Sequence, residues 1–261
     1  MANGWIIYNG NLKGDKFRDI AEWLQQSATK KNSDTTIIKN NDLLSVISID
    51  KPNILQWKKS TLPDYTLFFD KDIYLAKHLE SLGIRVFNRA EAIQISDDKI
   101  ATYQILANHK LPIPKTIIAP KVFPNGKENI DYIRMVNKTF TYPMIIKEAF
   151  GSFGEQVYLV HNEQELIQQV DKIKNKPFMF QQFIETSYGK DLRLHVVGNQ
   201  VVAATKRTSN NDFRANVTNG GTMEKYNPTN EEKDLAIAAT QAVGADFAGV
   251  DLLFGENHPI I

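Results

Sequence analysis

The sequence contains no cysteine. This absence excludes disulfide bonds, thiolate zinc sites and a cysteine nucleophile, and it favours the reducing cytosol. Long apolar runs are missing too, since no stretch approaches the roughly 20 residues that span a bilayer. The N-terminus also lacks the basic and apolar regions of a signal peptide. We therefore predict a cytoplasmic protein.

Neither basic nor acidic residues are in large excess. The 261 residues include 31 basic and 30 acidic side chains, with 42% hydrophobic and 23% charged residues. No overall field attracts nucleic acid or an anionic membrane surface, and we predict neither as a partner. Any anion site must be built locally. The oligomeric state stays open, with a homo-oligomer among the alternatives.

Short apolar runs alternate with helical patterns over the first ninety or so residues. Strands are predicted at 5–8, 37–38, 65–69 and 85–87, and helices at 17–28 and 73–82. Such alternation is typical of a parallel sheet with helices packed on it. It predicts a small open α/β domain that ends at a boundary within 88–97.

The remaining sequence predicts more strands, several of them antiparallel. Helices are expected at 98–109, 163–173 and 229–243, a turn-rich segment at 120–127, and strands at 115–118, 144–148, 157–160, 178–181, 192–197, 200–207 and 247–254. Gly198 and Asn199 predict a tight turn between antiparallel strands. Thr229 and Glu232 form a capping-box pattern at the last helix.

A short apolar strand ends in Lys147 and runs into the glycine-rich segment Gly151-Ser152-Phe153-Gly154. Glycines let backbone amides approach a phosphate, and a strand-end lysine can reach the same group. The pattern indicates a polyphosphate cradle. Taken alone, the pattern favours the alternative, a surface lysine beside an ordinary turn. The spacing fits neither a P-loop nor the dinucleotide fingerprint.

Charged residues concentrate on the predicted hairpin, with Asp191 and Arg193 on one strand, Lys206 and Arg207 on the other, and 212–216 beyond it. Residues two apart in a strand share a face, and the tight turn returns Arg207 to the same end. Arginine binds phosphate through its planar fork of donors. The alternative is a solvated hairpin face.

One carboxylate, Asp251, interrupts the last apolar strand. A buried charge needs compensation. Magnesium is a natural partner, because it links one or two carboxylates to substrate phosphates. An edge position facing water is the alternative. The five histidines fall at no metal-ligand spacing.

Together these motifs resemble the ATP-grasp superfamily, and specifically the RimK-type glutamate ligases. The similarity covers about 88–261 and runs in order through Asp98-Lys99, Leu111-Pro-Ile-Pro114, 143–154, Gln181-Gln-Phe-Ile184, Gly189-Lys-Asp-Leu-Arg193, 212–216, Gly220-Gly221 and Gly249-Val-Asp251. It implies an α/β pre-ATP-grasp domain at 1–96, then a two-subdomain α+β ATP-grasp fold. The central subdomain is expected at 97–182, and the C-terminal subdomain is expected at 183–261 and to be incomplete.

The resemblance also implies roles for particular residues. Lys99 and Lys147 would bind the phosphates of ATP, and a lid formed by Gly151, Ser152 and Gly154 would close over them. Gln182 and Phe183 would line the adenine pocket, and the nucleotide would also be contacted by Asp191, Arg214 and Asn216. Arg193 and Arg207 would be catalytic, and Asp251 would bind Mg²⁺ or Mn²⁺.

The activity implied by the resemblance is that of an ATP-dependent carbon–nitrogen ligase. A carboxylate attacks the γ-phosphoryl group, and an amine displaces phosphate from the resulting acyl phosphate. Glutamate or another amino acid would be joined to an acceptor carboxylate, either a small molecule or a peptide terminus. The alternative is a non-catalytic ATP-binding or scaffolding protein on the same fold.

Two positions depart from the family pattern. Gln156 stands where the loop usually has another glycine, and the chain ends at Ile261, where a Glu-x-Asn metal motif is expected to begin. The apolar end favours a piece of a longer ligase, which as it stands could be inactive, over a natural variant that binds nucleotide without efficient turnover.

Overall fold

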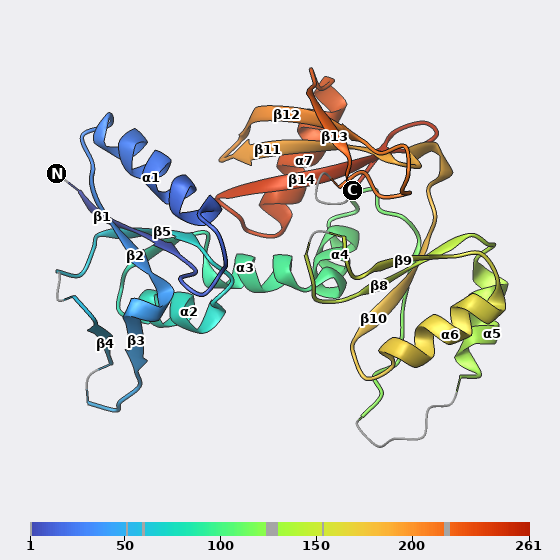
Figure 1. Cartoon of the computed structure of the whole chain (residues 1–261), viewed down its shortest axis with the longest axis horizontal. Helices are drawn as coiled ribbons and strands as arrows, with labels where there is room; N and C mark the ends of the chain where they lie inside the picture. The colour runs from blue at the N-terminus through green and yellow to red at the C-terminus, as the bar shows by residue number, and fades with distance from the viewer. Residues whose placement is uncertain (1, 51, 59–60, 124–129, 153, 217–219) are drawn as a thin grey trace. The chain divides into compact units, whose positions relative to one another are not determined.

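The computed structural model describes residues 2–50, 52–58, 61–123, 130–152, 154–216 and 220–261 (Figure 1). The chain divides into two compact units: unit 1 comprises 1–94 and 244–246, and unit 2 comprises 95–243 and 247–261. Part of the turn-rich segment expected at 120–127 lies outside the described residues. The domain bounds drawn from the resemblance stay a prediction.

Unit 1 is built on a parallel sheet with the strand order β2-β1-β5-β6. Its elements are β1 (Asn3–Tyr8), α1 (Lys16–Thr29), β2 (Asp34–Lys39), η1 (Asn40–Asp42), β3 (Leu43–Val46), β4 (Asn53–Gln56), β5 (Tyr65–Phe69), α2 (Ile73–Ser81) and β6 (Arg85–Phe87). The predicted βαβ alternation is confirmed. The β3–β4 hairpin, a separate two-stranded sheet, was not predicted.

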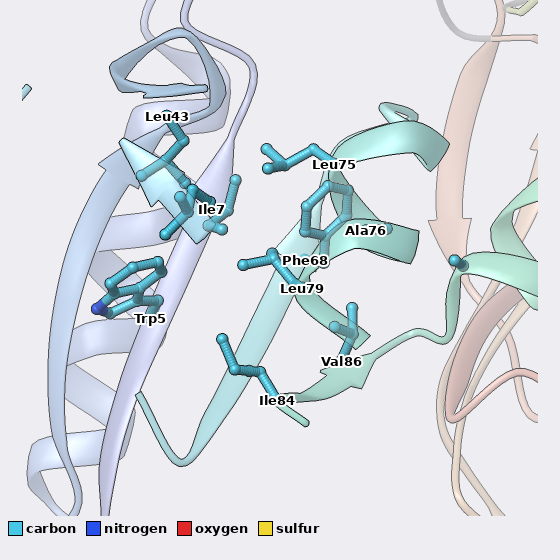
Figure 2. Close-up of a cluster of buried hydrophobic side chains, with 11 residues drawn as sticks. Trp5, Ile7, Leu43, Phe68, Leu75, Ala76, Leu79, Ile84 and Val86 are labelled. Carbon is cyan, nitrogen blue, oxygen red and sulfur yellow. The ribbon is translucent and has the colours of Figure 1, made fainter. Parts of the chain in front are cut away.

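The core of unit 1 lies on both faces of β1, because successive strand residues point to opposite sides. Trp5 and Ile7 pack with Phe68 of β5 and with Leu75 and Leu79 of α2. Figure 2 shows these side chains gathered in one cluster. The opposite face buries Ile6, Tyr8 and Ala21, with Phe17 and Leu24 of α1 packed against them. Burial on both faces explains the continuous apolar run of β1.

The segment expected as a boundary is helical. Helix α3 (Ala90–Asp97) occupies it, and α4 (Lys99–Asn108) follows after one residue. Asp98 caps α4, since its side chain accepts hydrogen bonds from the backbone N–H groups of Ile100 and Ala101. Of the side chains of α4, only that of Leu106 is buried.

The first sheet of unit 2 is antiparallel, with the strand order β7-β10-β8-β9. Its elements are β7 (Thr116–Ile118), α5 (Tyr132–Thr139), β8 (Met144–Glu148), β9 (Val157–Val160), α6 (Glu163–Ile173) and β10 (Phe178–Gln182). Met144 and Ile146 of β8 join the core formed with α5 and α6. Alternation therefore turns Ile145 and Lys147 to the other face. Helix α5 was not predicted.

The second sheet of unit 2 has the order β13-β12-β11-β14-β15 and is also antiparallel. Its elements are η2 (Glu185–Ser187), β11 (Lys190–Val197), β12 (Gln200–Thr208), β13 (Thr222–Lys225), α7 (Asn230–Ala242), β14 (Phe247–Phe254) and β15 (Pro259–Ile260). Leu192 and Leu194 pack with Leu235 and Ala239 of α7. The charged positions of β11 therefore face away from this core.

The capping box expected at α7 is present, with both reciprocal hydrogen bonds between Thr229 and Glu232. None of the helices in the described part of the chain is both long and apolar enough to cross a bilayer.

Candidate functional site

A cavity of about 470 Å³ lies within unit 2. Both sheets contribute to its wall, together with α4. Each site residue expected from the sequence lines it: Lys99, Lys147, Gly151, Ser152, Gly154, Gln182, Phe183, Asp191, Arg193, Arg207, Arg214, Asn216 and Asp251. The fold thus brings together residues that are up to 152 positions apart, from Lys99 to Asp251. The individual roles stay predictions.

Lys147 reaches the cavity from β8. Its Nζ donates a hydrogen bond to the Tyr103 hydroxyl at 3.1 Å and lies 5.3 Å from the centroid of that ring. The residue is half-buried, and no carboxylate pairs with it among the described residues. A lysine withdrawn from water without a counter-charge is suited to an anionic ligand.

The glycine-rich loop is held at both of its described glycines by cationic side chains. Lys99 Nζ donates to the Gly151 carbonyl oxygen at 2.9 Å, and Arg214 Nη1 donates to that of Gly154 at 2.6 Å. Gly154 has a φ of +76° and lies so close to Asn216 that an added Cβ would be 2.7 Å from its Oδ1. The loop therefore lies against residues 214–216, which follow β12 and precede β13 in the chain.

Gln156 extends across the same loop. A Cβ added at Gly151 would lie 2.1 Å from Gln156 Oε1 and 2.8 Å from its Cγ, and Gly151 has a φ of +132°. The Oε1 atom is buried and accepts no hydrogen bond within the described part of the chain. The glutamine that departs from the family pattern thus fills the space that a glycine would leave open.

Substitution of Gly151 by alanine is expected to lower the free energy of unfolding by about 1–3 kcal/mol, because it strains φ and displaces Gln156. Chemical denaturation measures this. Gly220→Ala is the matched control, since its φ is +88° but nothing lies within 4 Å of the added Cβ. The combined Gly151→Ala and Gln156→Gly variant should recover the part of this loss that comes from the clash between the added Cβ and Gln156. Equal losses for Gly151→Ala and Gly220→Ala would contradict the contact.

Two ion pairs between residues on neighbouring strands line the cavity. Arg207 on β12 lies opposite Asp191 on β11 and donates from Nε and Nη2 to its two oxygens, each at 2.6 Å. Arg193 on β11 lies opposite Asp251 on β14 and donates to both of its oxygens at 2.7 Å. Arg207 Nη2 is also 3.1 Å from Asp251 Oδ1, which joins the pairs into one network.

The network changes the proton affinities of its members. Burial raises the pKa of the Asp191 carboxyl, and the hydrogen bonds from Arg207 only partly offset it. Partial burial acts in the same direction on Asp251, but Arg193 and Arg207 outweigh it and hold its pKa below the usual range. Burial would lower the pKa of Arg207, whereas its hydrogen bonds to Asp191 and the charge of Asp251 raise it. The contacts between the arginines and the carboxylates thus oppose the effect of burial on the pKa of all three groups.

His195 lies two residues beyond Arg193 on β11, and its pKa responds to the charges of the network. Partial burial of its ring, together with the charge of Arg193, lowers its pKa below the ordinary 6.5, while Asp251 opposes the shift. An NMR titration should show a midpoint below 6.5, with the resonance assigned by its loss in His195→Gln. Arg193→Gln should move the midpoint upward. A midpoint at or above 6.5 in the unmodified protein would contradict the arrangement.

Asp251 offers one carboxylate to a metal ion. Its side chain is 42% exposed, and no group of three His, Cys, Asp or Glu residues converges as a metal site in the described ranges. A single carboxylate fits Mg²⁺, which takes its remaining ligands from water and phosphate. The sequence predicted that a cation would compensate the charge of Asp251. In the structure Arg193 and Arg207 compensate it.

Tyr103 and Lys190 are among the cavity-lining residues that sequence reasoning missed. From the sequence, Tyr103 was assigned no site role, yet its hydroxyl accepts the hydrogen bond from Lys147. Its spacing of four residues from Lys99 places both on one helix face, a signal that could have found it. Lys190 also lines the cavity, and its Nζ lies 5.5 Å from the ring centroid of Phe254.

The sequence belongs to a known family. A family model described as a RimK-like ATP-grasp domain matches residues 96–261, which is more than half of the chain. The protein is therefore a member of the RimK-like ATP-grasp family, and the resemblance expected from the motifs is confirmed.

Three relatives show how far the similarity extends. An uncharacterized protein of Mycoplasma pneumoniae, the MG012 homolog, is 35% identical over 256 residues, covering 94% of this chain and 86% of that protein. Human N-acetylaspartylglutamate synthase A is 34% identical over 204 residues, 77% of this chain and 50% of that one. A probable alpha-L-glutamate ligase of Parasynechococcus marenigrum is 35% identical over 190 residues, which cover 72% of this chain and 39% of that protein. The matched region spans half or less of the latter two proteins.

Solved structures confirm the predicted fold class. A RimK domain protein with an ATP-grasp fold from Sphaerobacter thermophilus has a TM-score of 0.73 at 19% identity, covering 99% of this chain and 89% of that one. The D-alanine–D-alanine ligase of Bacillus anthracis, solved in complex with ATP, has a TM-score of 0.70 at 17% identity. The match covers 100% of this chain and 84% of that one. At these identities the likeness shows the fold alone.

Proposed function

We propose that the protein is an ATP-dependent carboxylate–amine ligase that uses the cavity of unit 2 as its nucleotide site. The observation that carries this proposal is Lys147, half-buried in the cavity wall without a carboxylate partner among the described residues. The cavity supports it further: six cationic side chains and two carboxylates line the wall, an excess of four positive charges in a chain of net charge +1. A polyphosphate matches this charge.

Each part of the wall has a distinct task in this proposal. Lys99 and Lys147 would neutralise the ATP phosphates, and the loop from Gly151 to Gly154 would cover them. Gln182 and Phe183 would hold the adenine; Phe183 is packed edge-on against Tyr188, with ring centroids 6.1 Å apart. Asp251 would hold Mg²⁺, which when bound supplies charge neutralisation at the β- and γ-phosphates.

The remaining charged groups would act on the reacting centre. An oxygen of the substrate carboxylate attacks the γ-phosphorus, the bond between that phosphorus and the bridging oxygen breaks, and ADP leaves. The nitrogen of an amine then attacks the acyl carbon, loses a proton and releases inorganic phosphate. Arg193 and Arg207, fixed by their carboxylate partners, would stabilise the negative charge of the acyl phosphate. Catalysis then comes from positioning and charge, without a protein nucleophile.

Glutamate is the amino acid favoured by the names of two relatives, an alpha-L-glutamate ligase and an N-acetylaspartylglutamate synthase. The acceptor belongs to the class of carboxylates, either small molecules or peptide C-termini.

The test is an assay of the full chain with MgATP, glutamate and a panel of acceptors such as N-acetylaspartate and peptides that end in glutamate. ADP, phosphate and an amide product should form in equal amounts, and only when both substrates are present. Hydroxylamine should trap the acyl phosphate as a hydroxamate without glutamate. Binding of ATP without ADP formation under any of these conditions would favour the non-catalytic alternative.

A further inference from the structure

The contact between Tyr103 and Lys147 joins helix α4 to strand β8 in the wall of the cavity. Lys147 Nζ lies 3.1 Å from the Tyr103 hydroxyl oxygen, and both residues are half-buried. Figure 1 shows α4 beside β8, and both elements belong to unit 2. Both residues line the cavity. The pair therefore presents an ammonium group and a phenol group to the same space.

The chemistry of the two groups fixes the direction of their hydrogen bond. A lysine ammonium has three N–H donors and no acceptor, so the tyrosine oxygen is the acceptor. The phenol keeps its own proton in this bond and can donate it to a further acceptor. In the described part of the chain, the bond from Lys147 is the one hydrogen bond that the Tyr103 hydroxyl makes. Its proton is therefore available to a ligand.

The arginines of the cavity wall are bound differently. Arg193 and Arg207 each donate to both oxygens of a carboxylate, and Arg214 donates to a carboxylate and a backbone carbonyl oxygen. These acceptors belong to the protein and offset the positive charges. Lys147 donates to a neutral hydroxyl, which leaves the charge of its ammonium group uncompensated.

An anionic oxygen satisfies both members of the pair. It can accept a hydrogen bond from the phenol O–H and another from one of the two remaining N–H groups of Lys147. Hydrogen bonds linked in this way polarise and strengthen one another in a site of low dielectric constant. A carboxylate in the place of Tyr103 would instead cancel the charge that attracts the anion. A phenol orients the lysine without neutralising it.

We propose that Tyr103 is a phosphate-binding residue, whose hydroxyl is oriented by Lys147 and donates a hydrogen bond to a phosphate oxygen of the bound nucleotide. This inference rests on the proposed function, which assigns Lys147 to the phosphates of ATP. Tyr103 stands four residues after Lys99, so both side chains project from one face of α4. The helix thus supplies a neutral donor beside the lysines of the site.

The Tyr103→Phe variant tests the role of the hydroxyl, because the ring and its packing are retained. Titration calorimetry of the full chain should show that MgATP binding is weakened by about 10-fold or more, as expected for loss of a hydrogen bond to a charged group. Inorganic tripolyphosphate contains only the phosphates and should lose affinity by the same factor. The affinity for adenosine should not change.

Tyr142→Phe is the matched control for Tyr103→Phe. The Tyr142 hydroxyl donates to Asn137 Oδ1 at 2.8 Å, and Tyr142 does not line the cavity. This variant loses the same atom from another part of unit 2. Its affinities for MgATP and tripolyphosphate should equal those of the unmodified chain.

A double-mutant cycle tests whether Lys147 orients the Tyr103 hydroxyl. In the Lys147→Ala background the hydroxyl can rotate, so adding Tyr103→Phe should weaken MgATP binding by less than about 2-fold more. NMR gives an independent measurement. The ¹³Cζ resonance of Tyr103, assigned by its loss in Tyr103→Phe, should shift when tripolyphosphate is added. That of Tyr142 should stay in place.

Three results would overturn this inference and leave the proposed function standing. The first is weaker MgATP binding in Lys147→Ala but not in Tyr103→Phe. The second is an equal loss of adenosine affinity in Tyr103→Phe, which would mean that Tyr103 shapes the pocket. The third is unchanged tripolyphosphate affinity with weaker binding of a carboxylate acceptor. MgATP binding that is absent, or insensitive to Lys147→Ala, would contradict the proposed nucleotide site and this inference with it.

Discussion

Replacing Arg207 with alanine is expected to lower the free energy of unfolding by about 3–5 kcal/mol, the typical cost of leaving a buried charge without its partner. The side chains of Arg207 and Asp191 are only 6% and 12% exposed, and the two hydrogen bonds between them are 2.6 Å long. Removal of Arg207 leaves the buried Asp191 carboxylate without its ion-pair partner, and Asp251 then pairs with Arg193 alone. Urea denaturation followed by circular dichroism measures the loss.

Two controls separate the buried ion pair from general damage to β12. Lys206→Ala, at the adjacent position, should change stability by less than about 0.5 kcal/mol, because Lys206 makes a 3.6 Å contact with the exposed Glu224. Joint replacement of Asp191 and Arg207 by leucine should recover much of the loss, since neither charge is then buried alone. An Arg207→Ala variant as stable as Lys206→Ala would show that the pair is open to water in solution.

Lys147→Ala is expected to weaken MgATP binding by about 10–100-fold, since a hydrogen bond to a charged group contributes roughly 1.5–3 kcal/mol. The lysine stands in the cavity wall with only the Tyr103 hydroxyl and ring as described partners. Its loss removes a positive charge from the phosphate position without opening the core. Titration calorimetry gives the ratio of dissociation constants.

Lys176→Ala is the matched control for Lys147→Ala. Lys176 Nζ is 2.8 Å from Glu148 Oε2, and the residue does not line the cavity. Glu148 follows Lys147 on β8 and therefore points to the opposite face of the strand. MgATP affinity should be unchanged in this variant. An equal loss in both variants would indicate a long-range charge effect rather than contact with phosphate.

Local patterns in the sequence were enough to predict much of this fold. The tight turn at Gly198 and Asn199 predicted that Arg207 returns to the end of the hairpin where Asp191 lies, and the structure pairs them directly. The capping box of α7 depends on residues only three apart, and it is also present. Both predictions succeed because the deciding contacts are local or joined by a short turn.

The partner of Asp251 could not be predicted in this way. Arg193 is 58 residues away, and the two meet only because β14 adds to the sheet beside β11. Strand order of this kind is decided by tertiary packing, whereas the sequence shows only a carboxylate within an apolar strand. The β3–β4 hairpin was missed for a different reason: apolar residues on both faces of two short strands hide the alternation that identifies a strand.

Hydrogen–deuterium exchange of the full chain with and without MgATP is the most direct test that the cavity of unit 2 is the nucleotide site. Binding there predicts slower exchange of backbone amides in peptides that contain Lys147, Gln182 or Asn216, with the β3–β4 hairpin unchanged. Slower exchange confined to unit 1, or no change at saturating MgATP, would contradict it.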